Sequence, residues 1–251
     1  MPVGGEDRPT LRTLKGNLAV AGVDILYEDN HLLALNKPAG LLTQPSGKTE
    51  DNLEMRAKDW IKQTRNKPGE VFLHALHRLD KPVSGIVLFA RTSKGLSRMN
   101  EQMRKKSIVK IYHTVITKEL PALQGTLMHH LRHSRLRSVV ATSAEHGSRP
   151  SLLTYQIIGR LPGMFLVEII LETGRYHQIR AQLAASGSPI LGDTRYGGQK
   201  WLSVNGIALH HRRMEFMHPI LKSQIVIGAP YPANWPMVVN MKSEIGSQNT
   251  E

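Results

Sequence analysis

One carboxylate in this sequence stands among cations, where a nucleophile or a base could form. Asp80 lies between Arg78 and Lys81, just before the apolar run 86–90. Side chains alternate along an extended segment, so Arg78 and Asp80 should project to the same side. A nearby guanidinium favours the ionised form of a carboxylate, which suits a nucleophile or a base better than a general acid. A surface ion pair at a turn, with a free energy of about 0–1 kcal/mol, explains these residues equally well.

A second set of polar residues follows a turn at Gly174. In the segment 175–187, Ile179 and Leu183 stand at i, i+4, which predicts a helix anchored to the core with Arg180 on a flanking face. A loop rich in glycine comes next. The helix and the loop together hold these polar groups: Arg175, His177, Gln178, Arg180, Asp193, Arg195 and Tyr196. An ordinary amphipathic helix with solvated polar residues is the alternative interpretation.

A single aromatic residue, Tyr112, lies in the strand-like segment 108–117. Alternation places it on the same side as Lys110 and Thr114. A tyrosine beside a lysine in a basic region could stack on a nucleic-acid base. A tyrosine packed within the sheet is the alternative.

The charge balance indicates a polyanionic partner. The formal net charge is +13 at pH 7 and the sequence pI is about 10.1. Between residues 98 and 137, nine Lys or Arg accompany only two Glu, a local balance of +7. Such a concentration favours phosphates, although a basic protein without a nucleic-acid partner is also compatible with the net charge. We predict that RNA is bound by four cations in this stretch: Arg104, Lys105, Lys106 and Lys110.

Several other classes of protein fit the composition poorly. The chain has no cysteine, so disulfides, thiolate zinc sites and cysteine nucleophiles are excluded. No apolar run approaches the roughly 18–20 residues that span a bilayer, and no secretion signal is visible, so we expect a cytoplasmic protein without a membrane partner. Histidines are plentiful, but adjacent ones in a strand point apart and no His-Glu-x-x-His pattern exists. We expect no metal.

The periodicity predicts an α+β domain built on an extended, mostly antiparallel mixed sheet with flanking helices. We predict a flexible tail over residues 1–22, one catalytic domain over 23–241 and a C-terminal tail over 242–251. A hairpin is expected at 24–38, and helices are expected at 51–65, 93–106 and 175–187. The methionines of the second helix should belong to the core. Strands are expected in six further segments: 84–92, 108–117, 136–142, 152–161, 164–174 and 207–232, the last containing two strands.

Three motifs in this order closely resemble those of RluA-type pseudouridine synthases: "HRLDKPVSGIVLFART" (77–92), "KIYHTV" (110–115) and "GRYHQIRAQLAASGSPILGDTRYG" (174–197). The segments "LYEDNHLLALNKPAGLLTQP" (26–45) and "ALHHRRMEFMHP" (208–219) are similar to the family's opening hairpin and closing strand. Val83 stands where many members have threonine. We expect no S4 RNA-binding domain of the kind that some relatives carry at the N-terminus, so the catalytic domain should select the target and large-subunit rRNA is not implied as the substrate.

The resemblance implies an RNA uridine isomerase. Asp80 aligns with the catalytic aspartate that attacks the target uridine, whose base then detaches, rotates and rejoins the ribose through carbon 5. Arg78 aligns with an arginine that enters the helix where the uridine has left, and Ile179 with an apolar wall beside the uracil. Tyr112 aligns with a tyrosine that stacks on the target base, and Arg180 with an arginine that pairs with the catalytic carboxylate.

The same resemblance implies further expectations about partners. The reaction is redox-neutral and internal, so no cofactor is expected. The substrate should be structured RNA, either rRNA or tRNA, reached by flipping the uridine out of its helix. We expect a monomer with no obligate protein partner. Two alternatives stay open: a catalytically inactive RNA-binding or ribosome-associated protein on the same fold, and a basic DNA-binding protein, although no helix-turn-helix or zinc-finger spacing is present.

Overall fold

The computed structural model describes residues 19–20, 22–47, 51–66, 68–143, 145–201, 205–236 and 239–240. The predicted C-terminal tail, 242–251, lies outside these ranges, as does most of the predicted N-terminal tail. In chain order the elements are β1 (Ala19–Val20), β2 (Val23–Glu28), β3 (Leu32–Lys37), α1 (Leu53–Thr64), β4 (His74–Ala75), β5 (Ser84–Ala90), α2 (Ser93–Arg104), β6 (Val109–Ile116), β7 (Gln124–Ser134), β8 (Arg137–Ala141), β9 (Arg149–Leu161), β10 (Met164–Leu171), α3 (Gln178–Ala185), η1 (Thr194–Tyr196), β11 (Leu209–Met217), β12 (Gln224–Gly228) and β13 (Val239–Asn240).

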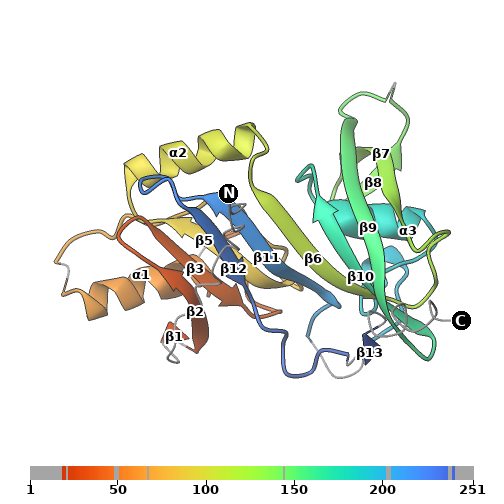
Figure 1. Ribbon diagram of the computed structural model, residues 1–251, viewed down its shortest axis with the longest axis horizontal. Helices are drawn as coiled ribbons and strands as arrows, with labels where there is room; N and C mark the ends of the chain where they lie inside the picture. Colours follow the sequence, from red (N-terminus) through yellow and green to blue (C-terminus); the bar gives the residue numbers. More distant parts are fainter. Residues whose placement is uncertain are drawn as a thin grey trace, which may run out of the picture.

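All the described strands belong to one mixed sheet, so the predicted fold class is confirmed. Its main order is β1-β2-β3-β5-β11-β6-β10-β9-β7-β8, with β12 beside β11, β13 beside β9 and β4 beside β5. Among the described strand pairs, β5 with β11 is parallel and the rest are antiparallel. Figure 1 shows this sheet running from β2 and β3 at one side to the tall β7–β8 hairpin at the other.

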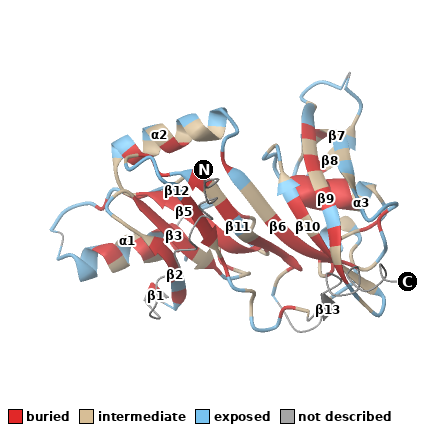
Figure 2. Cartoon of the chain, in the orientation of Figure 1, coloured by how far each residue is buried: buried red, intermediate tan, exposed pale blue. Residues whose placement is uncertain are grey.

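The first two helices cover opposite faces of the N-terminal half of the sheet. Strand β5 is buried along its whole length (Figure 2) and supplies both faces. Val87 and Phe89 share an apolar cluster with Leu53 of α1, while Leu88 shares another with Met99 of α2. Met99 is fully buried, so the prediction that this helix places a methionine in the core is confirmed.

Side-chain caps begin both helices where the sequence predicts them. The Asn52 side chain accepts the Met55 amide at 3.0 Å before α1, and the Thr92 hydroxyl accepts the Gly95 amide at 3.1 Å before α2. These bonds satisfy amides that have no partner inside the helix. Both helices therefore start at positions that local chemistry specifies.

The structure differs from the predicted elements most clearly in three places, and the two-residue strands β4 and β13 were also not predicted. Strand β7 was not predicted, because its largely polar, half-exposed residues show little apolar alternation. Helix α3 starts only at Gln178, because His177 adopts a left-handed backbone with φ +51° and ends the preceding turn. The ordered chain also extends into the region predicted as a tail, since β1 pairs with β2 and Val20 is fully buried.

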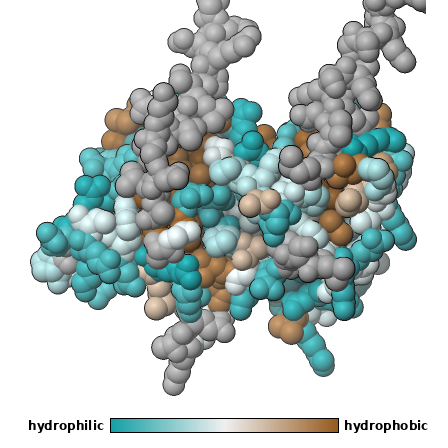
Figure 3. All heavy atoms as spheres, turned by 90° about the horizontal axis from the view of Figure 1, so that it is seen from below, coloured by the Kyte–Doolittle hydropathy of each residue, from teal (hydrophilic) through white to brown (hydrophobic). Residues whose placement is uncertain are grey.

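One face of the molecule carries mainly polar side chains (Figure 3). The face in Figure 3 is hydrophilic over much of its area, with separate apolar patches between the polar regions. In the described part of the chain, no helix combines the length and the apolar character that crossing a membrane requires.

The parallel contact between β5 and β11 depends on Gly85. This residue has φ +110°, and a Cβ atom added to it would lie 2.4 Å from the carbonyl oxygen of His211 and 2.6 Å from the His211 nitrogen. Both neighbouring atoms are backbone, so a small rotamer change cannot relieve the contact. The glycine therefore allows β11 to approach the strand that follows Asp80.

We predict that Gly85→Ala lowers the free energy of unfolding by about 2–6 kcal/mol, because it combines a strained φ with overpacking. Urea unfolding followed by circular dichroism measures this change. Gly69→Ala is the control, because a Cβ atom at Gly69 meets nothing within 4 Å. Equal stability of the two variants would contradict the proposed close approach.

Candidate active site

Asp80 is held in place by backbone contacts on both of its sides. On one side, the Thr43 hydroxyl donates to the Leu79 carbonyl at 3.0 Å and accepts the Leu79 amide at 3.1 Å. On the other side, the Lys81 carbonyl accepts the Gly40 amide at 2.8 Å. The loop between β4 and β5 is thus clamped to the segment that follows β3, which limits the movement of the carboxylate.

A buried arginine joins Asp80 to a second carboxylate. Arg180 Nη1 donates to Asp80 Oδ2 at 2.9 Å, while its Nε and Nη2 donate to the two oxygens of Asp193 at 2.7 and 2.9 Å. Burial opposes the charge of Arg180, but the hydrogen bonds and charges of Asp193 and Asp80 outweigh it and raise the pKa of the guanidinium. The contact between Arg180 and Asp80 that the resemblance implies is therefore present, and Asp193 is an additional partner.

His177 contacts the same oxygen of Asp80. Its Nε2 lies 3.3 Å from Asp80 Oδ2, and its Nδ1 lies 3.0 Å from the Tyr196 hydroxyl. The Tyr196 hydroxyl also accepts the Ser138 amide at 2.8 Å. Burial lowers the pKa of His177 to about 4, against the opposing effect of Asp80. A chain of polar contacts thus links Asp80, through α3 and η1, to strand β8.

Tyr112 lies near Asp80 and stacks on a histidine. Its ring is parallel to that of His211, with centroids 4.4 Å apart and an interplanar angle of 10°. Burial, reinforced by the negative charge of Asp80, raises the pKa of Tyr112, so the phenol stays protonated at neutral pH. One face of the ring is covered by His211, and the side chain as a whole is buried within the larger apolar cluster.

A buried lysine approaches the same loop from β3. Lys37 is fully buried, and its ammonium donates to the carbonyls of Pro38, Leu41 and Lys81 at 2.9, 2.7 and 3.2 Å. Burial lowers the pKa of Lys37 to about 7, and the charge of Asp80 opposes that shift. When protonated, Lys37 supplies a positive charge beneath the Asp80 loop.

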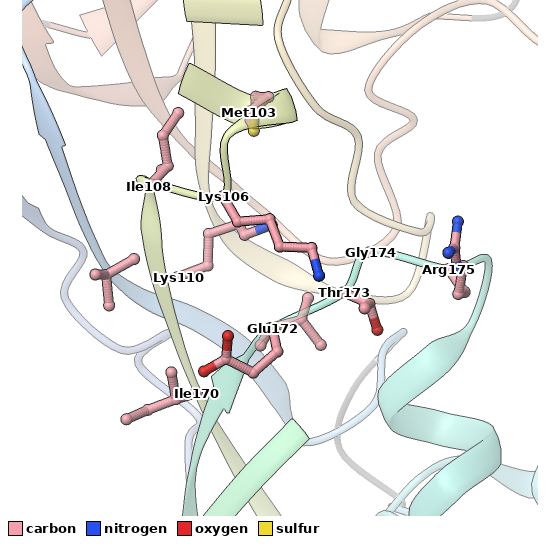
Figure 4. A pocket seen from close by; sticks show the side chains of 11 residues that line it. Met103, Lys106, Ile108, Lys110, Ile170, Glu172, Thr173, Gly174 and Arg175 are labelled. Carbon is pink, nitrogen blue, oxygen red and sulfur yellow. The ribbon is translucent and has the colours of Figure 1, made fainter. Parts of the chain in front are cut away.

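A hollow of about 200 Å³ lies between the end of α2, the start of β6 and the end of β10 (Figure 4). Lys106, Lys110 and Arg175 line it together with a single carboxylate, Glu172. None of these three cations forms an ion pair with the described residues. Lys110 lies two residues before Tyr112 on β6, so the two side chains project to the same side of the strand.

The predicted RNA-binding stretch is divided between two places. Arg104, Lys105 and Lys106 are exposed at the end of α2, where Lys105 pairs with Glu101 at 2.7 Å. The later cations of the stretch lie in and around the β7–β8 hairpin, which stands at the far side of the sheet from α2 in Figure 1. Lys110 is half-buried, and burial lowers its pKa, with Glu172 opposing the shift. The predicted footprint therefore has two arms instead of one continuous surface.

The two remaining predicted residues differ in exposure. Arg78 is exposed and forms no hydrogen bond or ion pair with the part of the chain that the structure describes. Ile179 is buried in the larger apolar cluster. Gln178 and Arg180, expected on flanking faces of the helix, are also buried, because α3 lies against β7 and β8 instead of at the surface. The alternative interpretation, an ordinary amphipathic helix with solvated polar residues, is therefore wrong for these positions.

Four residues join the site without a role predicted from the sequence: Lys37, His177, Asp193 and Tyr196. His177, Asp193 and Tyr196 belong to the motif at 174–197, and their closeness in sequence to Arg180 was the only indication that they join the site. Lys37 gave none, because only the tertiary structure buries a lysine of this kind.

The described residues contain no group of three or more His, Asp or Glu side chains arranged to hold a metal ion. The adjacent histidines of β11 instead make separate contacts. His210 Nδ1 lies 2.9 Å from the Ser84 hydroxyl, and His211 Nδ1 lies 2.8 Å from the Ile86 carbonyl. Their side chains serve the sheet and not a shared ligand.

Comparison with known proteins assigns this arrangement to a class. The RNA pseudouridylate synthase family matches residues 31–185. An uncharacterized RNA pseudouridine synthase of Bacillus subtilis, YhcT, is 34% identical over 215 residues, which are 84% of this chain and 70% of that protein. The ribosomal large subunit pseudouridine synthase C of Vibrio vulnificus is 31% identical over 82% of this chain and 65% of its own length. The chain belongs to the RNA pseudouridylate synthase family, a class of isomerases.

Solved structures agree on the fold. The human RNA pseudouridylate synthase domain containing 4 superposes with a TM-score of 0.69 at 22% sequence identity, over 83% of this chain and 88% of that one. A second human protein, RNA pseudouridylate synthase domain containing 1, superposes with a TM-score of 0.66 at 20% sequence identity, over 85% of each chain. The mixed sheet with its three helices is therefore the fold of this family.

Because His210 and His211 of β11 are buried, we predict that the protein loses stability in mild acid. Burial lowers the pKa of His210 to about 4 and that of His211 well below its ordinary value. Below about pH 6.5 the unfolded chain therefore binds protons that the folded chain does not. The free energy of unfolding should fall from pH 6.5 toward pH 4, by up to about 1.4 kcal/mol per pH unit for each histidine.

Urea unfolding at about pH 7.5, 6.5 and 5.5 measures this dependence. His210→Gln should reduce the slope below pH 6.5 by the share of one histidine, even if it lowers stability at pH 7.5. A free energy of unfolding that stays constant or rises between pH 6.5 and 5.5 would show that these groups are protonated in the folded state.

Proposed function

We propose that this protein isomerises uridine in structured RNA to pseudouridine, with Asp80 as the nucleophile. The observation that carries the proposal is the carboxylate of Asp80, held on one oxygen by the buried Arg180 and still partly exposed, with 23% of its side-chain surface accessible. Family membership supplies the reaction class. Whether the carboxylate attacks the ribose or the base ring stays open in this proposal.

The second carboxylate at the site supports one nucleophile and not an acid–base pair. A typical glycosidase uses two carboxyl groups on opposite sides of the bond, one of them free to give up a proton. Both oxygens of Asp193 are occupied by Arg180, and the residue is buried. Asp193 therefore acts as a support for Arg180, and Asp80 is left as the reactive carboxylate.

The surrounding residues fit a flipped-out uridine. Extruding a base costs a few kcal/mol, which phosphate contacts can offset. In this proposal, the ring face of Tyr112 that His211 does not cover stacks on the uracil, Ile179 of α3 provides an apolar wall, and the exposed Arg78 occupies the space that the base leaves. Because the isomerisation is internal and redox-neutral, the chemistry requires no cofactor.

The substrate is structured RNA, either rRNA or tRNA. Relatives from Vibrio vulnificus and Zymomonas mobilis are named ribosomal large subunit pseudouridine synthases C and D, which supports rRNA as the first substrate to examine. We further propose a cytoplasmic monomer, in line with an RNA substrate and the absence of cysteine. A catalytically inactive RNA-binding protein on this fold is disfavoured by the intact contact of Arg180 with Asp80.

Replacing the nucleophile should abolish catalysis and leave RNA binding intact. We predict that Asp80→Asn reduces tritium release from rRNA and tRNA transcripts labelled at uridine carbon 5 by more than about 10³-fold, because no other group can form the covalent bond. RNA affinity, measured by filter binding, should stay within about threefold. Asp59→Asn, an exposed aspartate of α1, is the control. Full activity of the Asp80 variant would overturn the assignment.

The cations that line the hollow should bind RNA phosphates. Replacing Lys106 and Lys110 together by methionine should weaken RNA binding and reduce the slope of log affinity against log salt by about 1.4–1.8, since each lost phosphate contact removes about 0.7–0.9. The double variant Lys62→Met, Lys94→Met removes the same charge from exposed positions on α1 and α2 and should change the slope less. An equal change in both double variants would mean that net charge alone, and not the hollow, controls binding.

A further inference from the structure

The two oxygens of Asp80 have different surroundings. Oδ2 receives Arg180 Nη1 at 2.9 Å and lies 3.3 Å from His177 Nε2. Within the described chain, no hydrogen-bond donor reaches Oδ1. Because both contacts converge on one oxygen, the other oxygen keeps its lone pairs and is the one available to a substrate.

For His177 to stabilise the carboxylate, its Nε2 must carry a proton. A neutral imidazole has one N–H and one bare nitrogen, so a proton on Nδ1 would turn the lone pair of Nε2 toward the negative oxygen. The contact on the far side of the ring therefore determines whether His177 attracts or repels Asp80.

Tyr196 is placed to make that choice. Its hydroxyl oxygen accepts the Ser138 amide at 2.8 Å, so this part of the oxygen is already used. Its single proton can go to His177 Nδ1 at 3.0 Å or to the Ser138 carbonyl at 3.1 Å. Donation to Nδ1 requires that nitrogen to be bare, which places the imidazole proton on Nε2, facing Asp80.

The surroundings of His177 favour the neutral imidazole, the form that has two tautomers. The charged groups that act on it are Asp80, Asp193, Arg180 and Arg195, two of each sign. The imidazole is buried and is covered on one face by Tyr176, whose ring centroid lies 3.9 Å away at an interplanar angle of 19°. A protonated ring would have to sit beside two guanidinium groups without access to water.

We propose that Tyr196 and His177 are positioning residues for the nucleophile: the Tyr196 hydroxyl selects the Nε2–H tautomer of His177, which together with Arg180 fixes Oδ2 of Asp80 and leaves Oδ1 directed at the uridine. This inference rests on the proposed function for its catalytic consequence. The tautomer itself is a property of the free protein and can be measured without RNA.

A matched pair of tyrosines tests the proposal, since Tyr196 and Tyr176 both contact His177 but only Tyr196 reaches it through the hydroxyl. Tyr196→Phe should reduce kcat by about 10–100-fold, as for other partners that fix the tautomer of a functional histidine, with KM and RNA affinity nearly unchanged. Tyr176→Phe removes a hydroxyl that lies 3.4 Å from the Leu136 carbonyl and should stay within about twofold of the parent.

The pH dependence separates positioning from a structural effect. A doubly protonated imidazole donates from Nε2 whatever its partner on Nδ1, so acid should restore part of the lost activity. Because burial lowers the pKa of His177 to about 4, the ratio of parent kcat to Tyr196→Phe kcat should change little between about pH 8 and pH 6 and should fall as the pH is lowered toward about 4.5. A ratio that stays constant with pH would contradict the tautomer mechanism, and so would unimpaired activity of Tyr196→Phe.

Two further measurements keep the outcome independent of folding and of the proposed function. In ¹⁵N NMR of histidine-labelled protein, with the His177 signal assigned by its loss in His177→Gln, the parent should show a protonated Nε2 and a bare Nδ1. Tyr196→Phe should shift this balance toward the Nδ1–H form. In the His177→Gln background, Tyr196→Phe should reduce kcat no further, because the amide has no tautomer to select; an additive loss would overturn the relay.

The Asp80→Asn variant, measured in the same assay, distinguishes the two levels of failure. If Asp80→Asn is inactive and Tyr196→Phe behaves like Tyr176→Phe, the relay is wrong and the proposed function stands. If Asp80→Asn is fully active, the proposed function is wrong, and the NMR result alone decides whether Tyr196 selects the tautomer.

Discussion

The site depends on one buried guanidinium that bridges two carboxylates. Arg180 is 4% exposed, and removing such a charge from water is costly unless it is paired and fully hydrogen-bonded. Asp193 supplies that pairing through two parallel bonds, and the remaining Nη1 reaches Asp80. The bridge therefore joins α3 and the segment just before η1 to the loop before β5, which lies 100 residues earlier in the sequence. The position of the Asp80 carboxylate therefore depends on the buried charge of Arg180, which is neutralised mainly by Asp193.

Asp80, Asp193 and Arg180 together carry a net charge of −1. Lys37, in the neighbouring part of the sheet, offsets this charge when it is protonated. Lys37 lies under the Asp80 loop with three carbonyl partners, and the negative charge of Asp80 favours its protonated form. The sheet holds these groups at fixed spacing, because β3 carries Lys37, β5 follows Asp80 and β6 carries Tyr112. The rigid contact of β5 with β11 at Gly85 places the stacked Tyr112–His211 pair next to the same loop.

Local features of the chain were predictable from the sequence because they depend on local chemistry. The hairpin of β2 and β3, the cap at Asn52 and the buried run of β5 each follow from periodicity or from a side chain that satisfies its neighbouring backbone. Strand β7 could not be predicted, since its polar residues meet the sheet on one side and solvent on the other. The burial of Lys37 and of Arg180 was equally hidden, because it depends on partners 44 and 100 residues away.

The proposed RNA-binding surface and the proposed positioning chain share one backbone amide. Ser138 belongs to β8, in the basic hairpin that forms one arm of the predicted footprint, and its amide is the donor that orients the Tyr196 hydroxyl. The Ser138 side chain also donates to the Tyr176 carbonyl at 2.5 Å, and Arg195 donates to the Leu136 carbonyl at 2.8 Å. Any displacement of this hairpin by a bound RNA would therefore move the partner of His177 as well. On the proposed function, a few short hydrogen bonds would therefore be enough to link phosphate contacts at the hairpin to the orientation of the Asp80 carboxylate.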